Sequence, residues 1–326
     1  MSDIVRTAHV GLGPIGLEII RAGVAGGKCL PVAAADISPE IAGRSLRQVT
    51  ESDDVPDVKV AGDLIEALNA AVEAGAEAAV VCTGSHVEAV ADQFEAALER
   101  GLCCISTCEE LTFPWLRSAT AADRLDGVAV EHDAVLLGAG VNPGFVLDLL
   151  PFVLTRVCES VRSVHASRCL DAGRRRRQLQ AKIGAGMDPE DFRALAAEGK
   201  IGHVGLAESA ALLADSLGWP WDEFEETIDP VIASEAISTE YFDVPAGRVR
   251  GQAQALRMGR VTLELVMALG EPDRDEVRIE GEPPVRAVIE GGVHGDRATA
   301  GIVINLLAPM LNAEPGLRTV TEIGLG

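Results

Sequence analysis

The sequence predicts an α/β fold: a doubly wound parallel sheet, followed by a second α/β domain with an open mixed sheet. In roughly the first 140 residues, short apolar runs alternate with helix-length stretches, which is typical of βαβ units. Later strand candidates alternate apolar and polar residues, which indicates sheets with one solvated or partner-facing side. The chain has 326 residues, of which 48% are hydrophobic, so two domains can each bury a full core.

Strands and helices alternate regularly in the first domain. Apolar runs predict strands at residues 7–10, 29–35, 78–82, 102–106 and 134–137, and helical spacing predicts helices at 14–25, 64–74 and 86–100. Because crossovers between parallel strands are right-handed, this order predicts helices on both faces of a single sheet.

The second domain combines strands with a helical insertion. A helix is expected at 145–157, strands at 161–168, 248–257, 260–268, 277–280 and 285–290, and the insertion at about 188–228. An apolar helix at 298–311 follows, and a late helix of this kind often packs on the first domain. We therefore expect a first domain over 1–141, a second domain over 142–296, to which the family resemblance given below assigns substrate binding and dimerisation, and a returning C-terminal segment over 297–326.

The charge balance argues against two classes of partner. The 50 acidic and 28 basic residues give a formal net charge of −22, which repels nucleic-acid phosphates and anionic lipids. No apolar run reaches the roughly 18–20 residues that span a bilayer, and residues 1–7 do not form a signal segment. We expect neither nucleic-acid nor membrane binding.

The seven cysteines predict reduced thiols in a cytoplasmic protein, because their number is odd and their spacing irregular. Cys103, Cys104 and Cys108 are close in sequence, but no C-x-x-C pair accompanies them. Neighbouring residues on a strand also point to opposite faces. We therefore expect no metal site.

A glycine-rich motif follows the first strand and opens the first helix. It reads GLGPIG (11–16), and its candidate cofactor-binding residues are Gly11, Gly13, Pro14, Ile15 and Gly16. In such a turn the first glycine makes the bend, the second lets a pyrophosphate approach the backbone, and the third lets the helix pack on the strand. The helix N-terminus then offers N–H groups to the anion. The motif predicts a dinucleotide-binding domain, the alternative being a glycine turn without a ligand.

Asp36 stands at the end of the next strand, 20 residues after Gly16. A carboxylate there can accept hydrogen bonds from both ribose hydroxyls, which favours NAD. Arg44 and Arg47 lie just downstream and could offset the 2′-phosphate of NADP. The expected cofactor is therefore NAD or NADP, and a solvated strand-end acid is the alternative for Asp36.

Two polar loops close the strands at 78–82 and 102–106. In open parallel sheets, ligands lie beyond the carboxyl ends of the strands, so both loops are expected to face the nicotinamide. The candidate cofactor-binding residues in these loops are Thr83, Gly84, Ser85 and Thr107.

Two adjacent carboxylates, Glu109 and Glu110, lie in the second of these loops. A carboxylate near the reacting carbon can move protons, so both are candidate catalytic residues. The equally weighted alternative is an acidic pair at a helix N-terminus, stabilised by the helix dipole.

The segment GAGVNPG follows the strand at 134–137 and precedes a helix. Its Asn142, followed by Pro143, could bind the nicotinamide carboxamide, because an amide offers both a donor and an acceptor. The alternative is an Asn-Pro turn at a domain hinge. The residues expected in the substrate pocket are Cys108, Phe145, Arg168 and His203, although a lone histidine is more often structural.

The chain resembles the 2,4-diaminopentanoate dehydrogenase and native amine dehydrogenase family, a branch near dihydrodipicolinate reductase. The matching stretches are GLGPIG (11–16), STCEEL (106–111), Pro114-Trp115, GAGVNPGFVLD (138–148), KIGAGM (182–187), GHVGLAES (202–209), Gly218-Trp219 and RATAGIVIN (297–305). They span nearly the whole chain, and STCEEL and GVNPGF are fairly specific.

This resemblance implies a Rossmann domain, an α/β substrate domain with an open sheet, and a homodimer. It also implies NAD(P)-dependent interconversion of an amine with a ketone or aldehyde plus ammonia. The family's active-site glutamate maps onto the Glu109–Glu110 pair, and we favour Glu109. The reductase branch carries a paired-histidine and lysine signature, whereas the corresponding region here reads SRCLDAGRRRR (167–177), which argues against dihydrodipicolinate reduction.

The sequence therefore predicts an NAD(P)-dependent amine dehydrogenase for a small aliphatic amine, with a carbonyl compound and ammonia as the other reactants. Two alternatives stay open. One is a dehydrogenase or reductase of another small carbonyl or imine substrate, and the other is a non-catalytic dinucleotide sensor.

Overall fold

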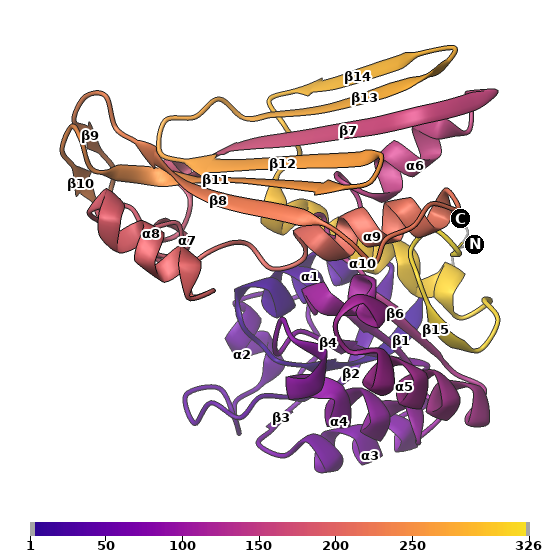
Figure 1. Ribbon diagram of the computed structural model, residues 1–326. Coiled ribbons are helices and arrows are strands. Elements are labelled where there is room, and N and C mark those ends of the chain that lie inside the picture. Colours follow the sequence, from indigo (N-terminus) through magenta and orange to yellow (C-terminus); the bar gives the residue numbers. More distant parts are fainter. Residues whose placement is uncertain (1–3, 324–326) are drawn as a thin grey trace. The chain divides into compact units, whose positions relative to one another are not determined.

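The computed structural model describes residues 4–323, which separate into two units. Unit 1 comprises Met1–Phe145 together with His294–Gly326, and unit 2 comprises Val146–Val293. The chain thus leaves unit 1 after Phe145 and returns to it at His294 (Figure 1). Each unit has its own sheet and its own hydrophobic core cluster.

A seven-stranded parallel sheet, counted over residues 4–323, forms the centre of unit 1 (Figure 1). The strand order is β15-β6-β5-β4-β1-β2-β3, so the direction of winding reverses between β1 and β4. The strands are β1 (Val5–Val10), β2 (Cys29–Ala35), β3 (Val60–Ala61), β4 (Ala78–Val81), β5 (Cys103–Ser106), β6 (Val135–Gly138) and β15 (Gly316–Arg318). This order confirms the doubly wound fold, in which ligands lie at the reversal point.

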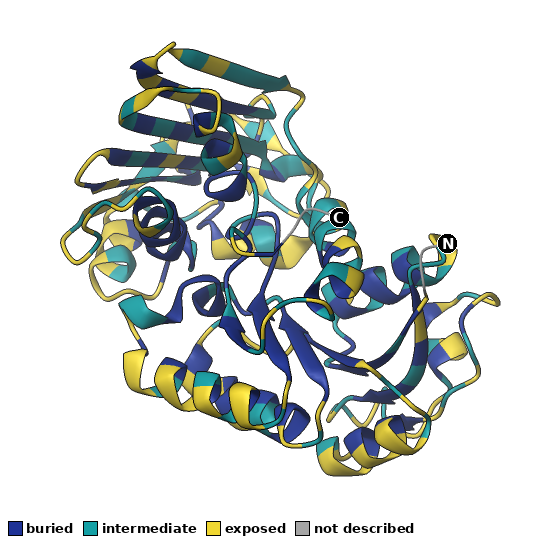
Figure 2. Ribbon diagram, turned by 90° about the vertical axis from the view of Figure 1, so that its right-hand side faces the viewer, coloured by how far each residue is buried: buried dark blue, intermediate teal, exposed yellow. Residues whose placement is uncertain are grey.

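Apolar faces of helices cover this sheet on both sides. The helices are α1 (Pro14–Ala25), α2 (Leu46–Thr50), α3 (Leu64–Glu73), α4 (Val87–Leu98), α5 (Ala119–Glu131) and α10 (Gly295–Met310), with short 3₁₀ turns η1 (Glu109–Thr112) and η2 (Pro114–Leu116). Figure 2 shows the strands buried and the outward helix faces exposed. The predicted helices at 14–25, 64–74 and 86–100 are confirmed.

The C-terminal helix α10 packs against α1 within unit 1. The approach is close, because a side chain at Gly23 of α1 would lie 3.3 Å from Ile304 of α10. Strand β15 then pairs with β6 in parallel. Helix α5 was not predicted. Strands β3 and β15 were not predicted either, because strands of two and three residues leave too little pattern in the sequence.

Unit 2 contains a six-stranded mixed sheet, counted over the described residues (Figure 1). Its order is β14-β13-β7-β12-β11-β8, in which β7 and β12 are parallel and the other neighbours antiparallel. The strands are β7 (Ser160–Asp171), β8 (Glu225–Ile232), β11 (Val249–Met258), β12 (Val261–Ala268), β13 (Arg274–Glu282) and β14 (Val285–Glu290), with a separate pair β9 (Ile237–Ser238) and β10 (Asp243–Val244).

The two faces of this mixed sheet differ in polarity. One, called the inner face, carries buried residues such as Ala166, Leu263 and Leu265, and α9 (Leu206–Ser216) packs on it. The other, called the outer face, carries half-buried or exposed residues such as Ser167 and Glu264. This alternation confirms the predicted open mixed sheet.

The predicted helical insertion at 188–228 is wrong in its last part. Helices α7 (Arg177–Lys182), α8 (Pro189–Ala197) and α9 do occupy the region between β7 and β8. Residues 225–228, however, begin the edge strand β8, which pairs antiparallel with β11. Pro230 within β8 is tolerated because an edge strand leaves some N–H groups without a strand partner.

The predicted helix at 145–157 is shorter than expected. Helix α6 covers Leu149–Thr155, because Gly144 adopts φ +118° and Asp148 caps the helix by accepting a hydrogen bond from Leu149 N–H at 2.6 Å. Over residues 4–323, no helix combines the length and apolar character that a bilayer crossing requires.

Candidate active site

The glycine turn between β1 and α1 is held by two glycines that the fold itself requires. Gly11 adopts φ +84°, and a Cβ there would lie 2.6 Å from the Cys82 carbonyl oxygen. At Gly16 a Cβ would lie 2.2 Å from the Gly11 carbonyl oxygen. Both positions therefore exclude larger side chains for reasons of backbone packing.

Gly13 is different, because the protein alone does not require a glycine there. Its φ of −66° suits any residue, and apart from Gly13 and its two chain neighbours no described atom lies within 4 Å of the position that a Cβ would occupy. Gly13 is the N-cap of α1, whose N-terminal N–H groups receive no side-chain cap. Pro14 occupies the first turn, where its missing N–H costs nothing. This open cradle at a helix N-terminus fits a pyrophosphate.

Asp36 follows β2 and lies against the glycine turn. Its carboxylate accepts hydrogen bonds from Leu12 N–H at 2.6 Å and Ser38 N–H at 2.8 Å, which orients it while leaving lone pairs for ribose hydroxyls. Next to it, Ile37 is 92% exposed, an apolar surface that the sequence analysis did not single out. The Arg47 guanidinium donates to the Val55 carbonyl and is thus engaged elsewhere.

The loops after β4 and β5 are joined at the carboxyl edge of the sheet. Thr83 Oγ1 donates to Gln93 Oε1 of α4 at 2.7 Å, and the Ser85 carbonyl accepts from Glu110 N–H at 3.1 Å. A Cβ at Gly84 would lie 2.9 Å from Val90, so this loop lies directly on α4. Thr107 N–H donates to the Val81 carbonyl and continues the sheet pattern.

Glu110 is buried and caps helix α4. One carboxylate oxygen lies 2.7 Å from His86 Nδ1, and the other accepts the Val87 N–H at 2.8 Å. Because α4 begins at Val87, the negative charge lies at the positive end of the helix dipole. His86, which the sequence analysis missed, is the exposed partner in this pair, since its side chain is 61% exposed.

Glu109 is half-buried and begins η1. The turn is fixed against the end of β6, because a Cβ at Gly138 would lie 2.5 Å from the Leu111 backbone. Cys108, which was expected in the substrate pocket, is buried. Its side chain is 1% exposed and belongs to the core, and burial raises the pKa of its thiol to about 12.

The segment after β6 folds tightly on itself. A Cβ at Gly144 would lie 2.5 Å from Gly140, and the Asn142–Pro143 peptide bond is cis. Val141 N–H donates to Thr299 Oγ1 of α10 at 3.2 Å, which ties the segment to unit 1. Phe145, half-buried, is the last residue of unit 1 before the chain enters unit 2.

Arg168 lies on the inner face of the unit 2 sheet with Asp275, and both are buried. Arg168 Nε is 3.7 Å from Asp275 Oδ1, Arg168 Nη2 donates to the Val293 carbonyl, and Asp275 Oδ2 accepts the Val293 N–H at 2.7 Å. Burial lowers the pKa of Arg168 and raises the pKa of Asp275. The pair therefore holds the chain at Val293, where unit 2 ends.

His203 lies in the loop before α9. Its backbone N–H donates to Gln254 Oε1 at 2.9 Å, and its carbonyl accepts from Gln254 Nε2 at 3.1 Å. The structure thus fixes the backbone of this residue to β11. Arg168 and His203 belong to unit 2, whereas the predicted cofactor-binding residues and the glutamate pair belong to unit 1.

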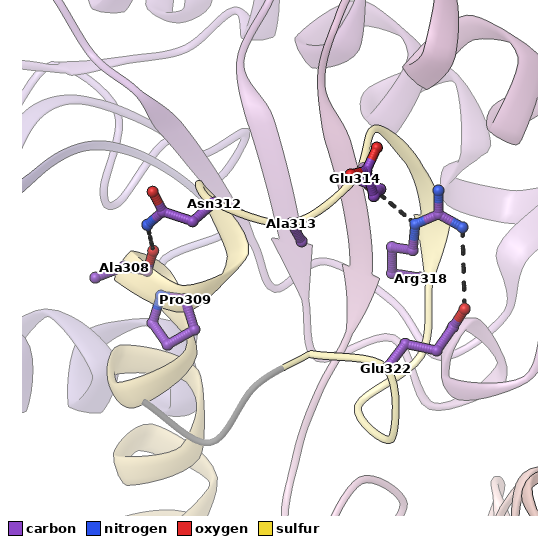
Figure 3. Close-up of a pocket in the computed structure, with 7 residues that line it drawn as sticks. All are labelled: Ala308, Pro309, Asn312, Ala313, Glu314, Arg318 and Glu322. Carbon is purple, nitrogen blue, oxygen red and sulfur yellow. Dashed lines mark hydrogen bonds and ion pairs between the residues drawn. The ribbon is translucent and has the colours of Figure 1, made fainter.

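A hollow of about 900 Å³ lies at the end of α10, and no residue of the glycine turn or the strand-end loops lines it (Figure 3). Polar groups that line it interact with one another. Asn312 Nδ2 donates to the Ala308 carbonyl at 2.9 Å, and Arg318 Nη1 lies 3.9 Å from Glu322 Oε1. Among the described residues, no group of three or more His, Cys, Asp or Glu side chains could hold a metal ion.

The model of the 2,4-diaminopentanoate dehydrogenase C-terminal domain matches residues 145–326. The chain belongs to this family. A curated relative, 2,4-diaminopentanoate dehydrogenase from Acetoanaerobium sticklandii, is 28% identical over 264 residues, which cover 77% of this chain and 74% of the relative. The amine dehydrogenase of Streptomyces virginiae is 23% identical over 357 residues, which cover 99% of this chain and 97% of that relative.

The fold is also that of a solved structure. The structure of the amine dehydrogenase from Mycobacterium smegmatis matches with a TM-score of 0.82 at 22% identity, and the match covers 99% of this chain and 96% of that chain. The likeness therefore extends over both units, as the motifs spread along the sequence had indicated.

Proposed function

We propose that this family member is an NAD(P)-dependent amine dehydrogenase. It would catalyse the reversible oxidative deamination of a small aliphatic amine to a ketone or aldehyde plus ammonia. The observation that carries the proposal is the open cradle at Gly13 in a chain whose substrate domain is of the diaminopentanoate dehydrogenase type.

The residues of unit 1 fit a nicotinamide dinucleotide. The N-terminal amides of α1 would hold the pyrophosphate, because Gly13 leaves the approach open. Asp36 would bind the adenosine ribose, which favours NAD over NADP. Thr83, Thr107 and Asn142 would lie along the nicotinamide half, at or near the carboxyl ends of β4, β5 and β6.

Glu109 would perform the acid–base chemistry. Glu110 is buried and caps α4, a structural role, so we assign the half-buried Glu109, which begins η1, to the substrate amine. Its carboxylate would attract the substrate ammonium and accept a proton from it. When bound, the nicotinamide supplies a hydride acceptor in deamination and a hydride donor in the reverse direction.

We also propose a homodimer formed through the outer face of the unit 2 sheet. This face carries small half-buried side chains, among them Ser167, Cys169, Ala253 and Ala255, on either side of Glu264, whose carboxylate lies 3.2 Å from His165 Nε2. The small side chains permit close approach of a second sheet. Light scattering of the purified chain tests this directly. The seven cysteines are free thiols, which supports a reducing, cytoplasmic compartment.

The decisive experiment is a panel of small aliphatic amines, each tested with NAD and with NADP, followed by absorbance of the reduced cofactor. Turnover of an amine, together with ammonium-dependent oxidation of the reduced cofactor in the presence of a carbonyl compound, is the expected result. Carbonyl or alcohol turnover without any need for ammonium would identify a different dehydrogenase instead.

A further inference from the structure

The unit 2 sheet has two edge strands, which differ in how they are protected. Among the described residues, β8 pairs only with β11, and β14 pairs only with β13 (Figure 1). A sheet edge presents unpaired N–H and C=O groups, and proteins usually block it with charges, prolines or bulges. Strand β8 is blocked in these ways, because it carries Glu225, Glu226, Asp229 and Pro230 and its pairing with β11 contains a register shift.

Strand β14, which reads VRAVIE, lacks most of these devices. It contains no proline, and its pairing with β13 runs from Val285 to Glu290 without a register shift. Its four apolar side chains are half-buried, and its two charged residues, Arg286 and Glu290, have opposite signs. An apolar edge of this kind is a template for pairing with another strand. The strand therefore has the composition of an interface.

The register with β13 fixes the face on which each β14 side chain lies. Val288 lies beside Glu276 of β13, whose side chain is on the outer face. Because side chains alternate along a strand, Arg286 and Glu290 share this face with Val288, and the other three side chains lie on the opposite face. A strand added in the plane of the sheet must match this alternation, because directly paired residues lie on the same face.

A second copy of β14 meets this condition best in one register. For two antiparallel copies with like faces aligned, the two-fold axis lies between two copies of the same residue. With the axis at Val288, Arg286 of each copy stands opposite Glu290 of the other, which gives two pairs of opposite charge. With the axis at Ala287 or Ile289, one charged side chain stands opposite Val288 and no such pair forms. An axis at Arg286 or Glu290 brings like charges together.

The two charged side chains are accessible to a second copy. The Arg286 side chain is 60% exposed, and the Glu290 side chain is 80% exposed. Within the chain, Arg286 Nε lies 2.7 Å from Glu276 Oε1, and Arg274 Nε lies 3.7 Å from Glu290 Oε1. A guanidinium carries five N–H donors and a carboxylate about four acceptor sites, so both groups can make a further bond across the edge.

We propose that β14 is an interaction strand that pairs antiparallel with β14 of a second copy of this chain, with Val288 at the two-fold axis. The pairing joins two six-stranded sheets edge to edge. It is a separate contact from the outer-face dimer proposed above, in which the sheets meet face to face, and both contacts can form in one assembly of four chains. The proposal does not depend on the catalytic function.

Cysteine cross-linking tests the register. Directly opposed residues of an antiparallel pair have Cα atoms about 4.5–5.5 Å apart, which is within the range of a disulfide. On mild oxidation with copper phenanthroline, Val288→Cys should form a covalent dimer of twice the 34.1 kDa chain mass, detected by non-reducing electrophoresis. A six-residue strand buries less than the roughly 1,200 Å² of a stable interface, so a covalent trap suits a contact that is weak alone.

Glu290→Cys is the matched control, because its thiol lies on the same strand and face at a more exposed position. In the proposed register it stands four residues from its copy, about 13 Å along the strand, beyond the reach of a disulfide. Val288→Cys should therefore cross-link at least about tenfold faster. Wild type, oxidised in parallel, gives the background from Cys82, Cys158 and Cys169, the cysteines that are not fully buried. Equal or faster cross-linking of Glu290→Cys, or no Val288→Cys dimer above this background, would overturn the proposal.

A charge reversal tests the two ion pairs. Glu290→Lys, introduced into the Val288→Cys protein, places a lysine opposite Arg286 twice, so cross-linking should slow by about fivefold or more. Glu225→Lys on β8 makes the same change at the other edge of the sheet and should leave the rate unaltered. The melting temperature of each variant, recorded alongside, shows whether it is folded, and the cysteine pair decides the question if a lysine variant is not. Equal slowing by both lysines would mean that net charge rather than register governs the contact, which contradicts the assignment.

Discussion

The carboxyl edge of the unit 1 sheet and the inner face of the unit 2 sheet are built in different ways. At the carboxyl edge of the unit 1 sheet, Glu110 and Asp36 are already bonded to the backbone, and the room for a ligand comes from the missing side chain at Gly13. On the inner face of the unit 2 sheet, Gln252 is buried, and its amide has no hydrogen-bond partner among the residues that the structure describes. The comparison teaches that the glycine turn depends on backbone shape, whereas the inner face of the unit 2 sheet depends on side-chain chemistry.

The sharpest test of the unit 1 region separates the two adjacent glutamates. Glu109→Gln keeps the shape but removes the charge and basicity, so kcat for amine oxidation should fall by roughly 10²- to 10⁴-fold. Steady-state kinetics with saturating cofactor measure this. Cofactor affinity should hardly change, because the glycine turn is a separate part of unit 1.

Glu110→Gln is the matched control for this experiment. It weakens the cap of α4 and the bond to His86, so the free energy of unfolding should fall by about 1–2 kcal/mol with little loss of kcat. Urea denaturation gives the stability. Should Glu110→Gln lose the activity and Glu109→Gln keep it, the roles are reversed.

Gly13→Val tests whether the room in unit 1 serves a ligand. A valine fits the fold, since nothing described lies within 4 Å of its Cβ, but it occupies the path of the pyrophosphate. We expect NAD(P)H affinity to fall by about 100-fold or more, measured by fluorescence titration, with an unchanged melting temperature. Gly16→Val, by contrast, should unfold the turn, because its Cβ would lie 2.2 Å from the Gly11 carbonyl. Undiminished affinity in folded Gly13→Val contradicts the site.

His9 in β1 makes unit 1 sensitive to acid. Burial lowers its pKa from 6.5 to about 3, so between these pH values the unfolded chain binds a proton that the folded chain does not. Stability is thus lost as the pH falls from 6.5, at about 1.4 kcal/mol per pH unit, or about 2 kcal/mol by pH 5. Urea unfolding of wild type and His9→Gln checks this, and parallel pH profiles would show that His9 does not contribute.

The smallest expected effect concerns the choice of cofactor. Asp36→Asn removes the charge that would face the 2′-phosphate of NADP, while it keeps an acceptor for Leu12 N–H. The ratio of kcat/KM for NAD to that for NADP should decrease by about tenfold. An unchanged ratio would mean that Asp36 does not contact the ribose.

The outer face of the unit 2 sheet provides a further contrast with its inner face. On the outer face, Glu276 is nearly inaccessible to solvent because Arg286, Arg278 and Arg274 surround it. Their guanidinium groups hold the pKa of Glu276 well below its usual range. On the outer face the buried Glu276 has three arginine partners, whereas on the inner face the buried Gln252 amide has no hydrogen-bond partner among the described residues. Burial alone therefore does not reveal a functional residue. The state of its hydrogen bonds must also be known.

Local pattern was sufficient to predict most of the elements of unit 1. The predicted strand at 29–35 coincides with β2, because an apolar run bounded by charges leaves little choice. Strand β8 was missed because its sequence, EETIDPVI, contains a proline, which is atypical of a strand. Its extended conformation depends on pairing with β11, which the local pattern does not show. Ile37 was missed because nothing in the sequence shows which apolar residues stay exposed.

The sequence by itself determined the doubly wound sheet, the glycine turn and the acid after β2, because these depend on residue order within single βαβ units. Tertiary structure alone decided which of two adjacent glutamates caps α4, since His86 and Glu110 are 24 residues apart in the chain. It also decided which of two glutamines on β11 has partners. Gln254 reaches a loop 51 residues away, whereas register places Gln252 beside a proline and a methionine. Such pairings depend on how distant segments meet, which no local pattern encodes.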